Sequence, residues 1–423
     1  MTASPWRALA NRRMLICVLT GFSSGLPLYL LLNLVPAWLK TEGLSLKAIG
    51  AFALIQFPYT WKFVWSPFLD RYALPLLGRR RGWMGATQVL LLGAIAWLGT
   101  LSPTSELGMV IGLTALIAFL SATQDIVLDA YRRELLPEIE LGIGNAIHVN
   151  AYKLAGLVPG SLSLVLADHL PWQQVFLVTA LFMAPGLAMT LMVKEPVTAA
   201  GAPRTLRDAV VEPFREFFGR HGVRSALVVL AFIFLYKLGD SLCTALATPF
   251  YLDMGFSKTE IGLIAKNAGL WLNVAGGLIG GIWLVNLGIN RGLWVFGVIQ
   301  AVVILGFAWL AEVGPSKAVL GIVIGAEAFG VGLGTAAFTA FIARSTDPRY
   351  TATQFALFTS LASVPRTFAN ASTGYIVEQT GWFGFFLICT ALAIPGLLLL
   401  PRVAPWNEPP APTPVPRVEP PAK

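Results

Sequence analysis

The chain has 423 residues, of which 56% are hydrophobic and only 12% are charged, and its mean hydropathy is +0.70. A soluble domain carries roughly 25% charged residues, so this composition excludes a protein whose whole surface faces water. The formal net charge of +8 does not indicate nucleic-acid binding, because the basic residues gather in the loops on one side of the predicted topology.

Apolar runs of about 20 residues, long enough to cross a bilayer as a helix, recur along the whole chain. We expect twelve transmembrane helices, at 14–38, 48–69, 83–101, 107–131, 142–167, 172–193, 224–251, 259–286, 290–312, 316–344, 351–377 and 382–401. The first follows Arg12 and Arg13, like the start of a signal peptide, but the later spans indicate a retained helix. Such long runs are not typical of a β-barrel.

The longest polar stretch between spans, residues 194–223, divides the spans into two groups of six. Leu206, Val210, Phe214, Phe217 and Phe218 recur there at near-helical spacing, which predicts an amphipathic helix on the membrane surface. We therefore expect a six-helix bundle over 1–193, a linker over 194–223, a second six-helix bundle over 224–402 and a disordered Pro-rich tail over 403–423.

The distribution of Lys and Arg predicts the orientation of the chain. With the N-terminus inside, 21 of these residues lie in inner segments, and the outer loops hold only Lys40, Lys47, Lys258 and Lys317. The positive-inside rule therefore predicts that both termini lie in the cytoplasm.

Eight charged residues lie well inside the expected spans, away from their ends, where an ionisable side chain normally faces a bundle interior or a polar cavity. They are Lys62, Asp125, Lys153, Lys237, Asp240, Lys266, Glu327 and Arg366. Five are cations and three are acids, so the expected cavity between the two halves favours an anionic substrate. The acids Asp125, Asp240 and Glu327 are candidates for proton coupling, and static ion pairing between helices is the alternative.

The segment DRYALPLLGRRRGW, residues 70–83, places an acid at the end of one span and arginines before the next. A carboxylate binds arginine through charge-assisted hydrogen bonds, so these residues predict a gate at the cytoplasmic end. Its candidate members are Asp70, Arg71, Arg79, Arg80, Arg81 and Asp129. The alternative is that the arginines only set the topology.

The sequence contains no H-E-x-x-H or phosphate-binding-loop motif. Its histidines and cysteines are too far apart for a metal site or a disulfide framework; they are His148, His169, His221, Cys17, Cys243 and Cys389. We therefore expect no enzyme activity, metal or cofactor. A channel or a transport-inactive membrane sensor is the alternative, but two groups of six spans with mid-helix charges favour alternating access.

Several stretches resemble the AmpG-type muropeptide permeases of the major facilitator superfamily: FVWSPFLDRYALPLLGRRRGW, ATQDIVLDA, YKLGD, GLIAKNAGL and TQFALFTSLASVPR. The resemblance implies an all-α membrane protein with the major facilitator fold, in which two six-helix halves enclose a mid-membrane substrate site. It also implies a monomer in the bacterial inner membrane that imports anhydromuropeptides, the fragments of peptidoglycan turnover, by proton symport. In that family the recycled fragments feed the signalling that induces β-lactamase.

The resemblance also identifies candidate substrate-binding residues, which are Lys62, Lys153, Lys237, Lys266, Arg366, Gln124 and Gln354. Longer family members carry two further helices after the twelfth. Shorter relatives include siderophore permeases, and acetyl-CoA transporters are more distant. All three substrate classes are anionic, so the excess of cations does not separate them.

Overall fold

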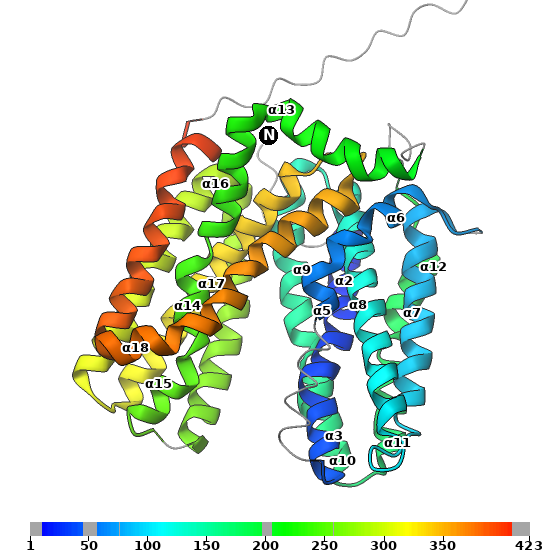
Figure 1. Ribbon diagram of the computed structural model, residues 1–423, viewed down its shortest axis with the longest axis horizontal. Coiled ribbons are helices and arrows are strands. Elements are labelled where there is room, and N and C mark those ends of the chain that lie inside the picture. The colour runs from blue at the N-terminus through cyan, green and yellow to red at the C-terminus, as the bar shows by residue number, and fades with distance from the viewer. Residues whose placement is uncertain (1–10, 45–56, 76, 197–204, 257, 408–423) are drawn as a thin grey trace, which may run out of the picture.

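The computed structural model describes residues 11–44, 57–75, 77–196, 205–256 and 258–407, and the described chain is helical apart from loops and one isolated bridge between Leu74 and Gly78 (Figure 1). The first half contains α2 (Arg12–Tyr29), η1 (Leu30–Leu34), α3 (Val35–Thr41), α5 (Phe57–Trp61), η3 (Lys62–Val64), α6 (Ser66–Arg71), α7 (Arg79–Leu98), α8 (Leu107–Leu135), η4 (Glu138–Glu140), α9 (Leu141–Ala155), η5 (Val158–Leu162), α10 (Ser163–Ala167), α11 (Trp172–Leu181) and α12 (Ala184–Met192). The second half contains α13 (Leu206–Leu235), α14 (Leu238–Ala245), α15 (Ala247–Asp253), α16 (Lys258–Val313), α17 (Lys317–Ser345) and α18 (Thr351–Val403).

Each of the twelve predicted spans coincides with helix in the part of the chain that the structure describes; residues 48–56 of the second span and the predicted tail beyond residue 407 lie outside it. Eight helices among the described residues are long and apolar enough to cross a membrane. Helices α16 and α18 each contain two of the predicted spans, separated by a kink. Gly288, with a φ of 75°, and Gly381, with a φ of 67°, divide them. These left-handed angles favour glycine, so the backbone turns there without strain.

Several spans are interrupted rather than straight, and two of the interruptions coincide with predicted site residues. Lys62 begins the short 3₁₀ segment η3, and Lys237 lies between α13 and α14 with φ −103° and ψ 4°. A π-helical segment follows Pro27 in the first span, and another contains Pro159 in the fifth. Irregular backbone inside a membrane protein is tolerated where it lines a cavity or is covered by protein. Both lysines are therefore placed where a helix leaves its regular path.

Glycines bring the central helices into close contact. A Cβ atom on Gly21 of α2 would lie 2.2 Å from the carbonyl oxygen of His148 in α9. On α16, Gly276 faces Phe329 of α17, whereas Gly281 faces Ala146 of α9. Small residues permit such backbone approach between membrane helices. Helix α16 therefore packs against its own half on one side and against the other half on the other side.

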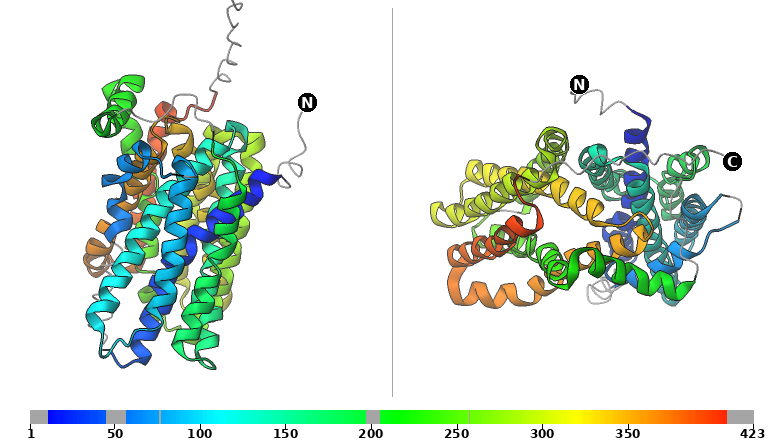
Figure 2. Two further views of the ribbon diagram at one scale, coloured as in Figure 1. Left: turned by 90° about the vertical axis from the view of Figure 1, so that its right-hand side faces the viewer. Right: turned by 90° about the horizontal axis from the view of Figure 1, so that it is seen from above.

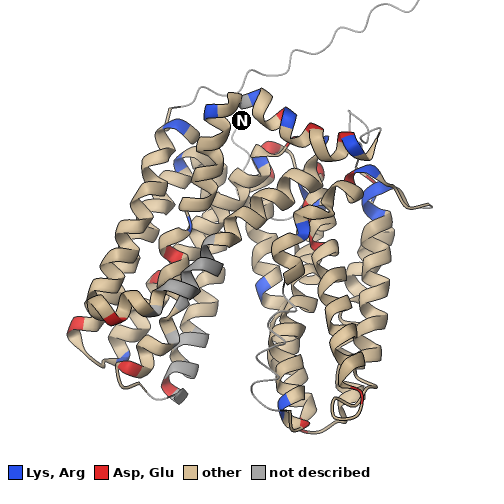
Figure 3. Cartoon of the chain, viewed as in Figure 1, with Lys and Arg blue, Asp and Glu red and all other residues tan. Residues whose placement is uncertain are grey.

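The helices form two bundles side by side, with α2 to α12 in one and α13 to α18 in the other (Figure 1). In the view from above, the start of α13 passes over the boundary between them (Figure 2). The bundles approach each other at this end and diverge toward the end that carries α3, α10, α11 and α15 (Figure 1). Most Lys and Arg residues lie at the end where the bundles meet (Figure 3).

Candidate functional site

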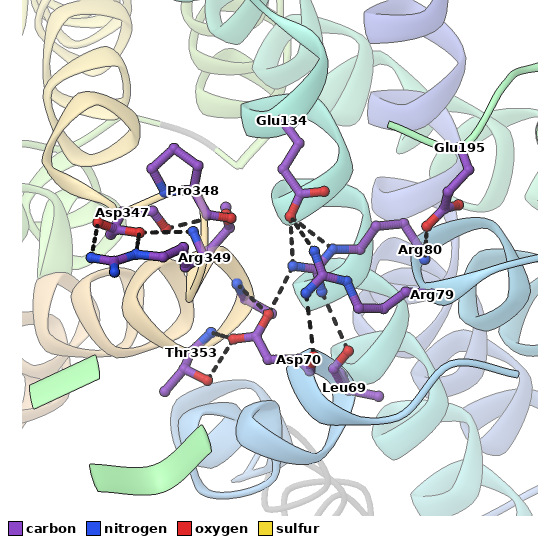
Figure 4. Close-up of polar contacts among 12 residues, drawn as sticks. Leu69, Asp70, Arg79, Arg80, Glu134, Glu195, Asp347, Pro348, Arg349 and Thr353 are labelled. Atoms are coloured by element: carbon purple, nitrogen blue, oxygen red, sulfur yellow. Dashed lines mark hydrogen bonds and ion pairs between the residues drawn. The ribbon is translucent and has the colours of Figure 1, made fainter. Parts of the chain in front are cut away.

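Asp70 lies at the centre of a polar network where the two bundles meet (Figure 4). Its carboxylate is fully buried near the end of α6, and Oδ1 accepts a hydrogen bond from Arg80 Nη2 at 2.8 Å. Oδ2 accepts from the backbone N–H of Thr353 at 2.8 Å and from its hydroxyl at 2.7 Å, and the N–H of Ala352 donates to Oδ1 at 3.2 Å. A carboxylate at a helix N-terminus is stabilised by the unpaired N–H groups and the helix dipole. Asp70 of one bundle therefore caps α18 of the other.

The arginines that follow are held by two acids that the sequence analysis did not select. Glu134 of α8 accepts from Arg80 Nη2 at 2.6 Å and from Arg80 Nε at 3.0 Å. Glu195 accepts the backbone N–H groups of Arg80 and Arg81, at 2.7 and 2.9 Å, and so caps the start of α7. Arg81 itself donates to the carbonyl groups of Thr190 and Leu191. The network thus joins α6, α7, α8 and the segment after α12.

The other candidate gate residues divide into one that joins this network and two that do not. Arg79 donates to the backbone carbonyl of Asp70 at 3.3 Å. The half-exposed Arg71 lies with its guanidinium carbon 5.3 Å from the centre of the Tyr72 ring and makes no hydrogen bond within the described residues. Asp129 lies in a separate cluster described below. The gate predicted from the sequence is therefore centred on Asp70, Arg79 and Arg80.

One further contact joins the bundles at the same end, and a second joins the first part of α13 to α17. Arg133 Nε of α8 donates to the carbonyl oxygen of Ala343 in α17. Arg220, in the first part of α13, donates to the carbonyl oxygen of Ser345 at 2.8 Å and forms an ion pair with Glu216 at 3.1 Å. Both carbonyl groups belong to the last turn of α17 or directly follow it, where helix carbonyls lack intrahelical partners. Arg133 thus links the two bundles and Arg220 links the linker part of α13 to α17, in both cases by satisfying the end of α17.

Gln354, a candidate substrate-binding residue, lies against the linker part of α13 and not with the membrane-embedded charges. Its Nε2 donates to the carbonyl oxygen of Pro213 at 2.9 Å and to Glu216 at 2.8 Å, and its Oε1 accepts the N–H of Asp347 at 2.7 Å. Burial opposes ionisation of Asp347, but hydrogen bonds from Arg349 outweigh this and hold the pKa of Asp347 below its ordinary value. Gln354 therefore orders the connection between α17, α18 and the linker.

A cluster of charged side chains lies inside the first bundle. The buried Lys62 Nζ is 2.6 Å from Asp125 Oδ2 and 3.9 Å from Asp129 Oδ2. Ser24 of α2 donates to the other oxygen of Asp125, and Arg132 Nη2 lies 2.7 Å from Asp129 Oδ1. Each carboxylate in this cluster therefore has a cationic partner, which is how buried charges are normally accommodated.

Neutral polar side chains extend this cluster between α2, α8 and α9. His148 Nδ1 is 3.1 Å from Thr20 Oγ1, and His148 Nε2 is 3.9 Å from Asp129 Oδ1. The fully buried Gln124 donates to the carbonyl oxygen of Ser23 at 2.8 Å. The sequence selected Gln124 as a substrate contact, and the structure gives it a bond between helices. The other polar atom of this side chain, Gln124 Oε1, has no hydrogen-bond partner among the described residues.

The second bundle carries a cluster of its own, which receives one side chain from the first bundle. Lys237 Nζ lies 2.9 Å from Asp240 Oδ2, and both side chains are mostly buried. Lys153 of α9 reaches across the boundary and donates to Asn273 Oδ1 of α16. Glu327 of α17 is 9% exposed and interacts electrostatically with Asp240, Lys237 and Lys153. Three candidate residues from the sequence analysis therefore surround Glu327.

Two candidate cations lie outside the described side chains. Lys266 is in α16 and Arg366 in α18, but the structure describes only their backbone. The predicted correspondence between Lys153 and Arg366 as opposed cations therefore stays a prediction. Among the described residues there is no group of three metal-ligating side chains, and Cys17, Cys243 and Cys389 are buried free thiols.

Comparison with known proteins supplies a family. The sequence matches the Major Facilitator Superfamily over residues 18–370. It is 51% identical over 407 residues to an uncharacterised protein of Haemophilus influenzae, covering 94% of this chain and 96% of that protein. It is 41% identical over 402 residues to the anhydromuropeptide permease of Escherichia coli, covering 95% of this chain and 81% of that protein. The structure resembles the human organic anion transporter MFSD10 with a TM-score of 0.71 and 17% identity, covering 94% of this chain and all of the other.

Proposed function

This chain belongs to the AmpG-type permeases of the Major Facilitator Superfamily, and from that membership we propose that it imports anhydromuropeptides from the periplasm by proton symport. The observation that carries the proposal is the 41% identity to the anhydromuropeptide permease of Escherichia coli over 95% of this chain. The chain is a multi-pass membrane transporter, and both termini are proposed to lie in the cytoplasm, on the side rich in Lys and Arg.

The substrate site is proposed to lie between the bundles, near Lys153 and Lys237. An anhydromuropeptide carries peptide carboxylates, which an ammonium group binds through charge-assisted hydrogen bonds. The partner of Lys153 within the described residues is the neutral amide of Asn273, so this cation is available to an anionic ligand without breaking an ion pair. Lys62, by contrast, is engaged by Asp125 at 2.6 Å, and its proposed role is to hold α5, η3 and α8 together.

The transport cycle is proposed to be alternating access. Contacts at the cytoplasmic end, centred on Asp70, Arg80 and Thr353, join the bundles in this structure, which suits a state closed toward the cytoplasm. Opening that end requires Asp70 to release the N-terminus of α18. A network of hydrogen bonds is suited to this task, because each bond that breaks on opening is replaced by a hydrogen bond to water. Its net contribution to the stability of the closed state is therefore far smaller than that of an apolar interface of the same area.

Uptake into cells tests the proposal. Labelled anhydromuropeptide is offered to cells that lack their own importer, with and without an uncoupler, and a ferric siderophore serves as the alternative substrate. We expect saturable muropeptide uptake that the uncoupler abolishes. Lys153→Gln should reduce uptake at least about tenfold, the effect of losing roughly 1.4 kcal/mol of binding. The control Lys317→Gln removes a mostly exposed lysine that pairs with Glu260 and should leave uptake unchanged. Uptake of the siderophore alone would overturn the proposed substrate.

A further inference from the structure

The two charged clusters place Asp125, Asp129, Asp240 and Glu327 within membrane-spanning helices, and the first three have a cation in contact. The carboxylate of Asp125 is 2.6 Å from Lys62, that of Asp129 is 2.7 Å from Arg132, and that of Asp240 is 2.9 Å from Lys237. Glu327 differs: its side chain is buried in α17, and it makes no hydrogen bond or ion pair within the described residues.

The difference matters because burial acts on the two forms of a carboxyl group unequally. An ionised carboxylate without a partner in a buried site costs several kcal/mol, whereas the neutral acid costs much less. Contact with a cation stabilises the ionised form, as in the three pairs above. Because Glu327 is buried and has no contacting cation among the described side chains, its surroundings suit a protonated side chain in this conformation.

The charged and titratable groups that face Glu327 come from three neighbouring elements. Helix α14 contributes Asp240 and Cys243, and Lys237 directly precedes it; α15 contributes Tyr251, and α9 of the other bundle contributes Lys153. Of the helices packed on α17, α16 carries Lys266 and α18 carries Arg366, whose side chains lie outside the description. Lys237 is already in contact with Asp240, whereas Lys153 contacts only a neutral amide. Among the described side chains, Lys153 is therefore the cation most readily available to an ionised Glu327.

We propose that Glu327 is the proton-carrying group of this transporter and that its carboxylate and the anionic substrate compete for Lys153. The inference rests on the proposed proton-driven import. With the cavity open to the periplasm, a protonated Glu327 leaves Lys153 free to bind a carboxylate of the substrate. After the substrate has left toward the cytoplasm, the Glu327 proton passes to water and the carboxylate pairs with Lys153. One proton thus enters and leaves per cycle, and substrate binds only when the proton is bound.

Two transport assays on the full-length protein in proteoliposomes separate this role from a structural one. The first measures accumulation of labelled anhydromuropeptide under an inward gradient of about one pH unit, which supports about tenfold accumulation for one coupled proton. The second measures counterflow of labelled against unlabelled substrate without a gradient, which needs movement of the carrier but no net proton transfer. We expect Glu327→Gln to lose accumulation and to keep counterflow.

The matched control is Glu312→Gln, which changes an exposed glutamate near the end of α16 and should keep both activities. A third readout is the pH dependence of substrate affinity. In the unsubstituted protein, affinity should fall as the pH rises, because ionised Glu327 then takes Lys153. In Glu327→Gln, affinity should stay constant over the same range, because the amide cannot ionise. A loss of packing alone would not remove a pH dependence.

The outcomes separate this inference from the function on which it rests. If the unsubstituted protein accumulates substrate and Glu327→Gln still does so, the assignment of Glu327 is overturned and proton-coupled import stands. Loss of counterflow in Glu327→Gln would also overturn it, since the side chain would then be needed for carrier movement. If the unsubstituted protein shows no gradient-driven accumulation, the proposed function itself fails.

Discussion

Replacing Asp70 by asparagine should open the end of the protein where the two bundles meet, which is proposed to face the cytoplasm. The substitution keeps the shape of the side chain but removes the charge that pairs with Arg80 at 2.8 Å and accepts three hydrogen bonds from Ala352 and Thr353. Removing one partner of a buried ion pair costs about 3–5 kcal/mol. Arg80 keeps Glu134 at 2.6 Å, so we expect the lower end of this range. About 3 kcal/mol corresponds to a roughly 100-fold shift in the ratio of closed to open protein.

A single introduced cysteine reports this shift. Ala343 is 1% exposed at the closed end, and Ala343→Cys is made in a background without the three native cysteines. A membrane-impermeant maleimide applied from the cytoplasmic side should label this cysteine much faster when Asp70→Asn is added. The control Asp168→Asn changes a carboxylate that makes no ion pair or hydrogen bond within the described residues. Equal labelling rates for Asp70→Asn and the parent would refute the reasoning that this network holds the end closed.

Three further perturbations test other parts of the account. Lys62→Gln leaves Asp125 buried without its cation and should lower the stability of the detergent-solubilised protein by about 3–5 kcal/mol, seen as a lower melting temperature. Adding Asp125→Asn should recover part of the loss, and additive effects of the two substitutions would contradict the pairing. Gly332→Ala places a Cβ 2.3 Å from a backbone oxygen of α16 and should cost about 1–3 kcal/mol, whereas Gly321→Ala meets nothing closer than 3.7 Å and should be tolerated. The pKa of Asp347 is lowered in the folded protein, so its contribution to stability is present above its unfolded-state pKa and is lost as the pH falls through the folded-state pKa. Asp347→Asn should therefore reduce the loss of stability at acid pH in a plot of stability against pH. An unchanged loss would contradict this.

Hydropathy and charge located most of the fold, because a membrane restricts the chain to helices of nearly fixed length. The positions of the spans, the division of the chain at the polar linker and the turns near Gly288 and Gly381 follow from that restriction. The internal irregularities at Lys62 and Lys237 did not follow, because a short 3₁₀ turn and a helical break leave hydropathy unchanged. They depend on packing between helices that are distant in sequence.

The candidate site was predicted as a set of charges but not as a set of contacts. Spacing along one helix identifies pairs such as Lys237 and Asp240, three residues apart, which do lie in contact. It does not reveal that Asp70 caps α18 or that Lys153 reaches Asn273, since those partners are 283 and 120 residues away in sequence. Thr353 and Asn273 gave no signal of their own, because short polar residues in a span are commonly packing residues.

Glu134 and Glu195 were overlooked for a different reason. Glu134 lies in the last turn of α8 and Glu195 follows α12, at the end of the molecule rich in Lys and Arg, where acids among arginines are commonly surface charges. In the structure Glu134 contacts Arg80 beneath the surface, and Glu195 caps α7. A search for acids able to pair with buried arginines at the inner helix ends, rather than for acids inside the spans, would have selected them. Conversely, Gln354 was grouped with the substrate site although it bonds the linker helix.

Substrate-induced proton movement tests the central claim most directly. Anhydromuropeptide is added to a lightly buffered suspension of proteoliposomes that contain only this protein, and the external pH is recorded while labelled substrate is counted inside. Proton symport predicts that the external medium becomes more alkaline as substrate enters, and that an uncoupler abolishes the change. Entry of substrate at a constant external pH would contradict proton-coupled import.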